Sequence, residues 1–156
     1  MDALWNHLYV FLISMVPVIE LRGAIPVGAI LDLPLWSNYL VSVVGNFLPV
    51  PFILLFIRYI LDWMKTTKRL ARIALWLEEK AQRGSEKVQK YASLGLFLFV
   101  AIPLPGTGAW TGALVAALMN MKKKYALPSI LLGVMAAGVI MSLASYGVVA
   151  GLEFFL

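Results

Sequence analysis

Two interruptions in otherwise apolar sequence constrain the fold of this chain more than any other feature. Four apolar stretches cover most of the 156 residues: 3–35, 35–61, 94–121 and 126–152. The stretches 35–61 and 126–152 are continuous and long enough to cross a membrane, because about 20 apolar residues span its hydrocarbon core. The other two are each broken near the middle by proline and glycine. We therefore expect two spans and two interrupted segments in a single membrane domain.

The composition excludes several classes of protein. Hydrophobic residues make up 62% of the chain and charged residues 13%, whereas soluble domains have about 45–50% and about 25%. The chain has no cysteine and only one histidine, His7, so disulfides and thiolate or histidine metal sites are not expected. No hydrolytic, nucleotide-binding or zinc-protease motif occurs. We expect an integral membrane protein that is not an enzyme, uses no cofactor or metal, and does not bind nucleic acid.

The first interrupted stretch contains the charged residues Glu20 and Arg22, followed by Gly23 and Pro26. A charge at membrane depth costs at least about 2.5–3.5 kcal/mol, which makes these residues a functional-site hypothesis. Glycine and proline favour a non-helical turn here, in which Glu20 and Arg22 point to the same side and either lie near each other or each face the other hairpin. Desolvation favours the neutral acid and a nearby arginine favours the carboxylate, so Glu20 could exchange a proton. The alternative is a static ion pair that holds the turn.

The second interruption, PLPGTGAWTG (103–112), carries no charge but has a distinctive backbone. Its prolines prevent a continuous helix, and its glycines permit positive φ and close backbone approach. A helix that begins near Ala109 would direct unpaired N–H groups toward the turn, an arrangement that attracts anions. The candidate site residues here are Pro103, Pro105, Gly106, Thr107, Gly108 and Trp110, with Thr111 secondary. Trp110 either lines a cavity or packs in the core.

The distribution of basic residues favours two opposed hairpins. Basic residues flank 94–121 on both sides, so a single crossing would place one basic cluster outside, against the positive-inside rule. We expect this stretch to enter from the cytoplasm, turn at 103–108 and return. The stretch 3–35 would enter from outside and turn near 20–26. Both termini are then predicted to lie outside a prokaryotic-type cytoplasmic (inner) membrane.

The predicted fold class is an all-α integral membrane protein with two inverted repeats, 1–61 and 93–156. Each repeat is a re-entrant helical hairpin followed by a transmembrane helix. Residues 62–92 join the repeats as a cytoplasmic amphipathic helix, which is an anionic-lipid contact, a gate or a plain linker. The segments 16–29 and 102–113 both open with an apolar residue before proline and close with Gly-Ala. Inverted repeats of this kind place a transport site near the membrane midplane.

The continuous stretches add two further expectations. Asn46 precedes Pro49 and Pro51, two prolines that kink or unwind the span. Its side chain either bonds backbone freed at the kink or faces substrate. Small residues at four-residue spacing along 126–152 allow close helix approach, within the fold or in a homodimer.

The motifs ELRGAIP (20–26) and PLPGTGAWTG (103–112), in a chain of this length, resemble the small multidrug export protein family. That family is similar to the DedA/VTT membrane protein superfamily. The resemblance implies opposed re-entrant hairpins and the transport of lipids such as undecaprenyl phosphate, or proton-dependent drug tolerance. DedA proteins typically have an acidic residue where Thr107 stands, which leaves Glu20 as the only intramembrane carboxylate.

Together these features predict a proton-coupled membrane transporter for an amphipathic anionic substrate, such as a polyprenyl phosphate or a phospholipid headgroup. Arg22 and the backbone of the second interruption would bind the headgroup, and Glu20 would exchange protons. Membrane lipids are the other expected partners. The first alternative is an exporter of lipophilic cations with Glu20 as counter-ion. The second is a membrane scaffold that transports nothing.

Overall fold

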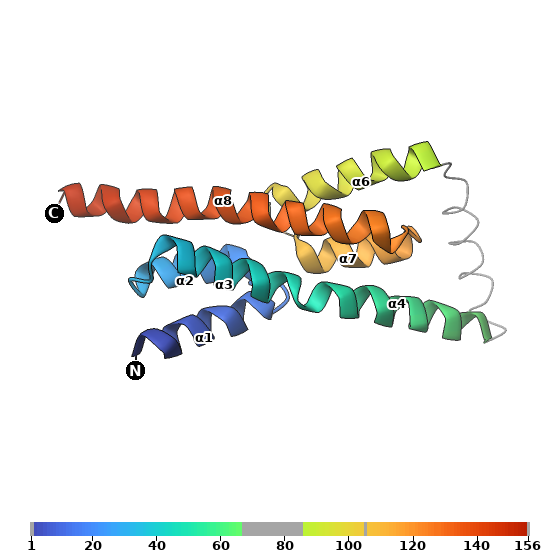
Figure 1. The fold of residues 1–156 in the computed structure, drawn as a ribbon, viewed down its shortest axis with the longest axis horizontal. Coiled ribbons are helices and arrows are strands. Elements are labelled where there is room, and N and C mark those ends of the chain that lie inside the picture. The colour runs from blue at the N-terminus through green and yellow to red at the C-terminus, as the bar shows by residue number, and fades with distance from the viewer. Residues whose placement is uncertain (1, 67–85, 105, 156) are drawn as a thin grey trace.

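The computed structural model describes residues 2–66, 86–104 and 106–155, and every regular element within them is an α-helix. The helices are α1 (Asp2–Met15), α2 (Glu20–Ile30), α3 (Leu35–Phe47), α4 (Pro49–Thr66), α6 (Glu86–Ala101), α7 (Ala109–Leu118) and α8 (Lys123–Phe155). The predicted all-helical class is therefore confirmed for this part of the chain. Figure 1 shows these helices aligned roughly along one long axis.

The two continuous apolar stretches form the two long helical segments, as predicted. Leu35–Ile57 (23 residues) and Lys123–Gly151 (29 residues) are each long and apolar enough to cross a membrane. The first of them is interrupted at Leu48, between α3 and α4. Pro49 and Pro51 cause the break because neither supplies a backbone N–H to the helix. The predicted kink is thus confirmed.

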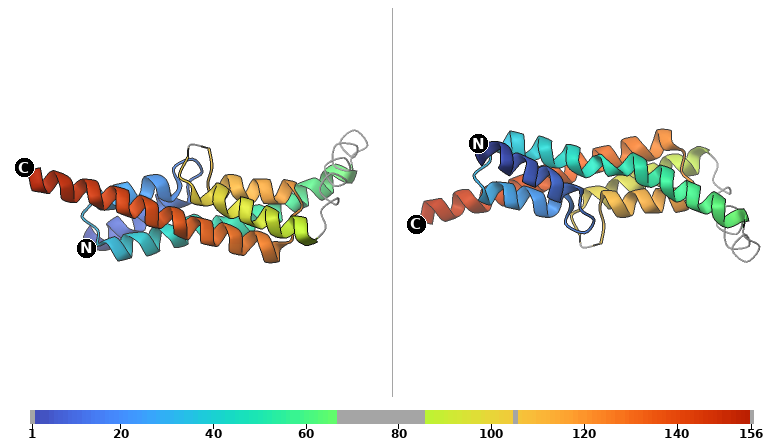
Figure 2. Two further views of the ribbon diagram at one scale, coloured as in Figure 1. Left: turned by 90° about the horizontal axis from the view of Figure 1, so that it is seen from above. Right: turned by 90° about the horizontal axis from the view of Figure 1, so that it is seen from below.

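Each interrupted stretch forms a helical hairpin. Residues 16–19 join α1 to α2, and residues 102–108 join α6 to α7. The hairpins approach from opposite ends of the long axis, and their tips meet near its middle (Figures 1 and 2). The predicted turn at 103–108 therefore lies where expected.

The turn of the first hairpin was predicted wrongly. It lies at residues 16–19, whereas Glu20–Ile30 is helical and contains both Gly23 and Pro26. Pro26 removes one N–H, which would have paired with the carbonyl of Arg22, and the other backbone groups still bond internally. In apolar surroundings that internal pairing outweighs the weak helix propensity of glycine and proline. Glu20 and Arg22 consequently share one helical turn rather than an extended segment.

Glycines allow the long helices to approach the hairpins closely. A Cβ at Gly45 would lie 2.7 Å from the carbonyl oxygen of Phe11 on α1, and one at Gly133 would lie 3.0 Å from that of Phe97 on α6. Contacts this short are possible only without a side chain, so the predicted packing role of small residues is confirmed within the fold. Gly147 has open space around it, and the homodimer stays a prediction.

The surface of the described residues is strongly apolar. Large hydrophobic side chains are exposed on every described helix. Aromatic residues are exposed at both ends of the long axis: Trp5 and Trp36 at the starts of α1 and α3, Trp63 and Tyr91 near the end of α4 and the start of α6. Such paired aromatic belts are typical of a membrane protein, with one belt at each interface.

The ends of the predicted linker, 62–92, belong to α4 and α6, which reach Thr66 and start at Glu86. Residues 67–85 lie outside the described residues, so the amphipathic helix predicted there stays a prediction. The inverted repeat also stays a prediction, because alternating hairpins and long helices do not by themselves establish it.

Candidate functional site

Glu20 is held at the start of α7 on the opposite hairpin. Its side chain is 3% exposed, and its Oε1 accepts a hydrogen bond of 3.1 Å from the backbone N–H of Trp110. A helix N-terminus carries partial positive charge and unpaired donors, and it stabilises a carboxylate. The sequence predicts an anion site at this end of α7, and in the structure the protein's own carboxylate lies there.

Trp110 joins the two hairpins a second time. Its indole Nε1–H donates a 3.0 Å hydrogen bond to the carbonyl oxygen of Met15, the last residue of α1. The side chain therefore packs between the hairpins rather than lining an open cavity.

Arg22 is held at the end of α6, which is the other helix of the second hairpin. Its Nη1 donates to the carbonyl oxygens of Leu104 and Thr107. Its Nη2 donates to the hydroxyl of Thr107 at 2.8 Å, and to the carbonyl oxygens of Ile102 at 3.3 Å and Val100 at 3.5 Å. The last carbonyls of a helix have no partner within the helix and carry partial negative charge, so this end suits a cation.

Glu20 and Arg22 thus bond across to the second hairpin and not to each other. The carboxylate lies at the positive end of α7, and the guanidinium lies at the negative end of α6. The sequence-based alternative of a static pair within one turn does not describe this arrangement. We call the group formed by Glu20, Arg22, Thr107 and the backbone of 100–104 and 106–110 the tip site.

Gly108 makes room for the carboxylate. A Cβ at this position would collide with the carboxylate of Glu20, and the φ of Gly108 is 140°. Gly106 also has positive φ, 78°, but its missing Cβ faces open space. Only Gly108 is therefore required by both conformation and space.

The backbone of the first tip is strained. Val18 and Glu20 have φ values of 79° and 52°, a region that costs L-residues about 1–3 kcal/mol each and is found mainly at functional sites. Val18 is β-branched, which makes its positive φ a genuine outlier. The chain thus adopts an unfavourable backbone to deliver Glu20 to the end of α7.

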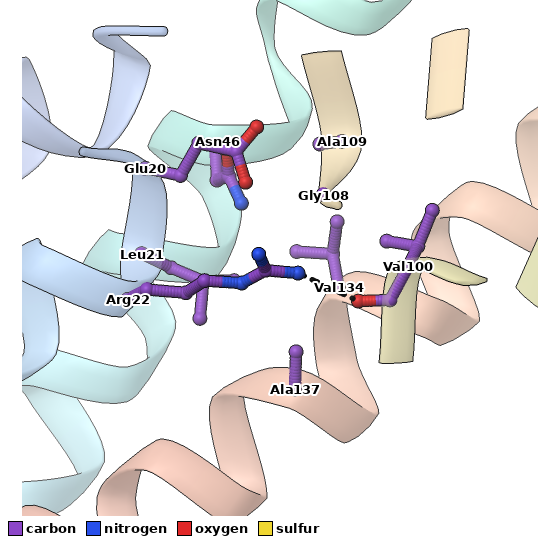
Figure 3. Close-up of a pocket in the computed structure, with 9 residues that line it drawn as sticks. All are labelled: Glu20, Leu21, Arg22, Asn46, Val100, Gly108, Ala109, Val134 and Ala137. Atoms are coloured by element: carbon purple, nitrogen blue, oxygen red, sulfur yellow. Dashed lines mark hydrogen bonds between the residues drawn. The ribbon is translucent and has the colours of Figure 1, made fainter. Parts of the chain in front are cut away.

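A tight pocket surrounds the carboxylate; Glu20 and Asn46 both line it, and Arg22 enters from α2 (Figure 3). The other lining residues are apolar or glycine, and the pocket has no space for a water molecule. Asn46 is 1% exposed, and its Oδ1 has no hydrogen-bond partner among the described residues. A buried acceptor without a partner is rare and calls for a specific explanation.

The predicted site residues divide into two groups. The structure brings together Glu20, Arg22, Thr107, Gly108, Trp110 and Asn46. Gly23 and Pro26 lie further along α2, and Thr111 along α7, and none of them lines the pocket. Pro103 lies in the turn, Gly106 is exposed, and Pro105 lies outside the described residues.

Sequence reasoning missed the acceptors of Arg22 and the apolar wall of the pocket. The acceptors are backbone carbonyls, and their only signal was the two prolines that end α6 and leave its last carbonyls unpaired. The wall includes Val100, Val134 and Ala137. No pattern distinguishes these from other apolar residues.

Two helices long and apolar enough to cross a membrane, with a buried carboxylate and a half-buried guanidinium held where two hairpin tips meet, indicate a membrane protein with a polar site inside an apolar body. Residues 20–140 match the family model described as "Putative small multi-drug export protein", and the chain belongs to this family. The match spans the whole tip site, from Glu20 to Trp110. No curated protein and no solved structure matches the chain. An export family agrees with the expectation of a transporter rather than an enzyme.

Proposed function

We propose that this export-family protein is a proton-coupled transporter of an amphipathic anionic substrate, such as a polyprenyl phosphate or a phospholipid headgroup. The observation that carries the proposal is the crosswise contact in the tip site. There a buried carboxylate and a guanidinium are each held by hydrogen bonds from the opposite hairpin. Charges are retained at such depth where they serve a transport or proton pathway.

The proposal places the tips at the membrane midplane, between two inverted repeats. Two local correspondences support the repeat. The carbonyl oxygen of a phenylalanine on the first hairpin helix faces a glycine of the following long helix in both halves: Phe11 with Gly45, and Phe97 with Gly133. In addition, a glycine occupies the fourth position of both α2 and α7, at Gly23 and Gly112. Val18 on the first tip is 96% exposed, which is favourable in lipid and costly in water.

Arg22 is the proposed headgroup ligand. Its planar fork donates to backbone carbonyls and a hydroxyl in the closed arrangement, and a phosphate offers stronger, charge-assisted acceptors to the same donors. The pocket has no space even for a water molecule, so the tips must separate before a headgroup reaches it. In the proposed cycle this arrangement of the tips is the closed state.

Asn46 supports the proposed proton site on Glu20. An ionised carboxylate only accepts hydrogen bonds, whereas a protonated one also donates. Asn46 lines the same pocket as Glu20, and its buried Oδ1 has no partner among the described residues, so it is available to accept that proton. Among the described residues, Arg22 is the only other charged one that lines the pocket, and no water fits there.

Transport in liposomes tests these roles, with a polyprenyl phosphate as the probe and an imposed pH gradient. We expect Glu20→Gln to stay folded, because an amide oxygen still accepts from Trp110, and to lose the dependence of transport on the gradient. Asn46→Leu should unfold at a temperature equal to or above that of the wild type, since it removes an unsatisfied buried acceptor, and should weaken the coupling. Undiminished, gradient-dependent transport by both variants would refute the proton site.

Export of lipophilic cations is the second candidate function. It is favoured by the fact that both terminal nitrogens of Arg22 donate to backbone acceptors, which leaves Glu20 as the more available charge. In that case Arg22→Ala keeps export of a cationic dye while Glu20→Gln abolishes it. Under the anionic-substrate proposal, Arg22→Ala loses transport of the phosphate probe. Failure of the wild type to move either probe would favour the scaffold alternative.

A further inference from the structure

A second cavity lies between α6 and α7, apart from the tip site. Its volume is about 260 Å³, and among the described residues it shares no lining residue with the pocket around Glu20. The described residues that line it are all apolar or glycine, among them Gly95, Phe99, Val115 and Met121. Gly95 is exposed, as is Met119 at the same cavity, so the cavity opens to the surface of the molecule.

Positive charge adjoins one end of this apolar cavity. Met121 lines it, and the next three residues, Lys122, Lys123 and Lys124, are all exposed. The ammonium of Lys124 lies 4.9 Å from the centre of the Tyr125 ring. The first turn of α8 begins at Lys123 and adds partial positive charge of its own. An apolar cavity beside a cationic cluster matches a ligand with an apolar chain and an anionic head.

The size and position of the cavity select among such ligands. Pockets for drug-like molecules have about 300–1,000 Å³, and this one is smaller. It is also bounded by two methionines, whose flexible side chains adapt to an irregular chain. In the proposed topology the lysines lie at the cytoplasmic face, where anionic lipids are concentrated.

We propose that this cavity binds one hydrocarbon chain of an anionic phospholipid, with the phosphate held by Lys122, Lys123 and Lys124. The site is independent of the transport proposal, because neither Glu20 nor Arg22 contributes to it. A lipid bound there fills the gap between the two helices of the second hairpin and so stabilises its base.

Gly95 provides a direct test. A Cβ at this position meets no atom within 4 Å, so Gly95→Leu introduces no clash at its Cβ and extends its side chain at a residue that lines the cavity. Gly147→Leu on α8 is the matched control, since a Cβ there is equally free and Gly147 does not line the cavity. The probes for the full-length protein in detergent are dioleoyl phosphatidylglycerol and dioleoyl phosphatidylcholine, and the readout is native mass spectrometry.

We expect one phosphatidylglycerol per chain to bind tightly to the wild type and to Gly147→Leu. Gly95→Leu should weaken binding by about tenfold, the equivalent of about two methylene groups left unburied. Replacing all three lysines with glutamine should remove the preference for phosphatidylglycerol over phosphatidylcholine.

Val115→Phe fills the same cavity from α7 and keeps the test decisive if Gly95→Leu fails to fold. Wild-type affinity in either folded variant would overturn the proposal. Displacement of the lipid by inorganic phosphate alone would overturn it too, because the chain is the part that we assign to the cavity.

Discussion

Glu20 and Arg22 are stabilised by atoms that belong to the backbone of the other hairpin. A hydrogen bond to a charged group contributes about 1.5–3 kcal/mol, and each charge at membrane depth costs at least about 2.5–3.5 kcal/mol. The several bonds of Arg22 can therefore offset its burial, whereas the fewer bonds that Glu20 accepts from the start of α7 leave less margin. The carboxylate is thus the member of the pair that a change in protonation or spacing disturbs first.

Two glycines of the second tip, Gly106 and Gly108, allow the cost of a strained backbone to be distinguished from the cost of a steric collision. Gly106→Ala should cost about 1–2 kcal/mol, because an L-residue at positive φ is strained. Gly108→Ala should cost more, since its Cβ also displaces the Glu20 carboxylate and leaves the Trp110 N–H unpaired. Unfolding in detergent measures both values. Equal losses for the two variants would show that Glu20 does not require the space at Gly108.

At the scale of elements, α8 positions the end of α6 that binds Arg22. Gly133 packs against Val100 and the carbonyl oxygen of Phe97, and the carbonyl oxygen of Val100 is one acceptor of Arg22. A second contact joins α8 to the first half of the chain. The hydroxyl of Tyr146 on α8 donates a hydrogen bond of 2.6 Å to the carbonyl oxygen of Leu33. The long helix therefore braces both hairpins along its length.

A methyl group at Gly133 tests this bracing. Its carbon would lie 2.7 Å from Cβ of Val100, so Gly133→Ala should destabilise the protein by about 1–3 kcal/mol through overpacking and reduce transport. Gly147→Ala on the same helix meets no atom and should be neutral or slightly stabilising. Thermal unfolding and transport are the measurements. Loss of stability in both variants would point to a general effect of β-carbons on α8.

At the scale of the whole molecule, exposed aromatic residues at both ends and an apolar surface between them are consistent with a chain that lies across a membrane. The start of α3 lies at one end of the long axis, and the start of α8 lies toward the other (Figure 1). The tips of both hairpins meet between these ends. The proposed topology puts the loop before α3 outside and the start of α8 in the cytoplasm.

Single cysteines can test that topology, because the chain contains none of its own. In intact cells a membrane-impermeant maleimide should label Trp36→Cys, and it should label Lys123→Cys only after permeabilisation. Val18→Cys should resist labelling in both conditions, although Val18 is 96% exposed in the isolated molecule, because the midplane holds no water. Labelling of positions 36 and 123 from the same side would contradict opposed hairpins.

The sequence was sufficient for the long helices, the kink at Leu48 and the turn at 103–108, because length, proline and apolar character are local signals. It failed at the first turn, since Gly23 and Pro26 weaken a helix in water far more than in apolar surroundings. It also identified Glu20, Arg22 and Thr107 but not their mutual geometry. The acceptors of Arg22 are carbonyls, which every residue has, so only the folded chain could show which ones meet the guanidinium.

The helical turn shared by Glu20 and Arg22 has a mechanical consequence. One turn of helix is rigid, so any rotation or sliding of α2 moves both side chains together. The carboxylate of Glu20 cannot leave the start of α7 by such a movement unless the guanidinium of Arg22 also leaves the end of α6. Proton uptake by Glu20 and the release of Arg22 would then both result from one rigid-body displacement of α2, with no relay of residues between them.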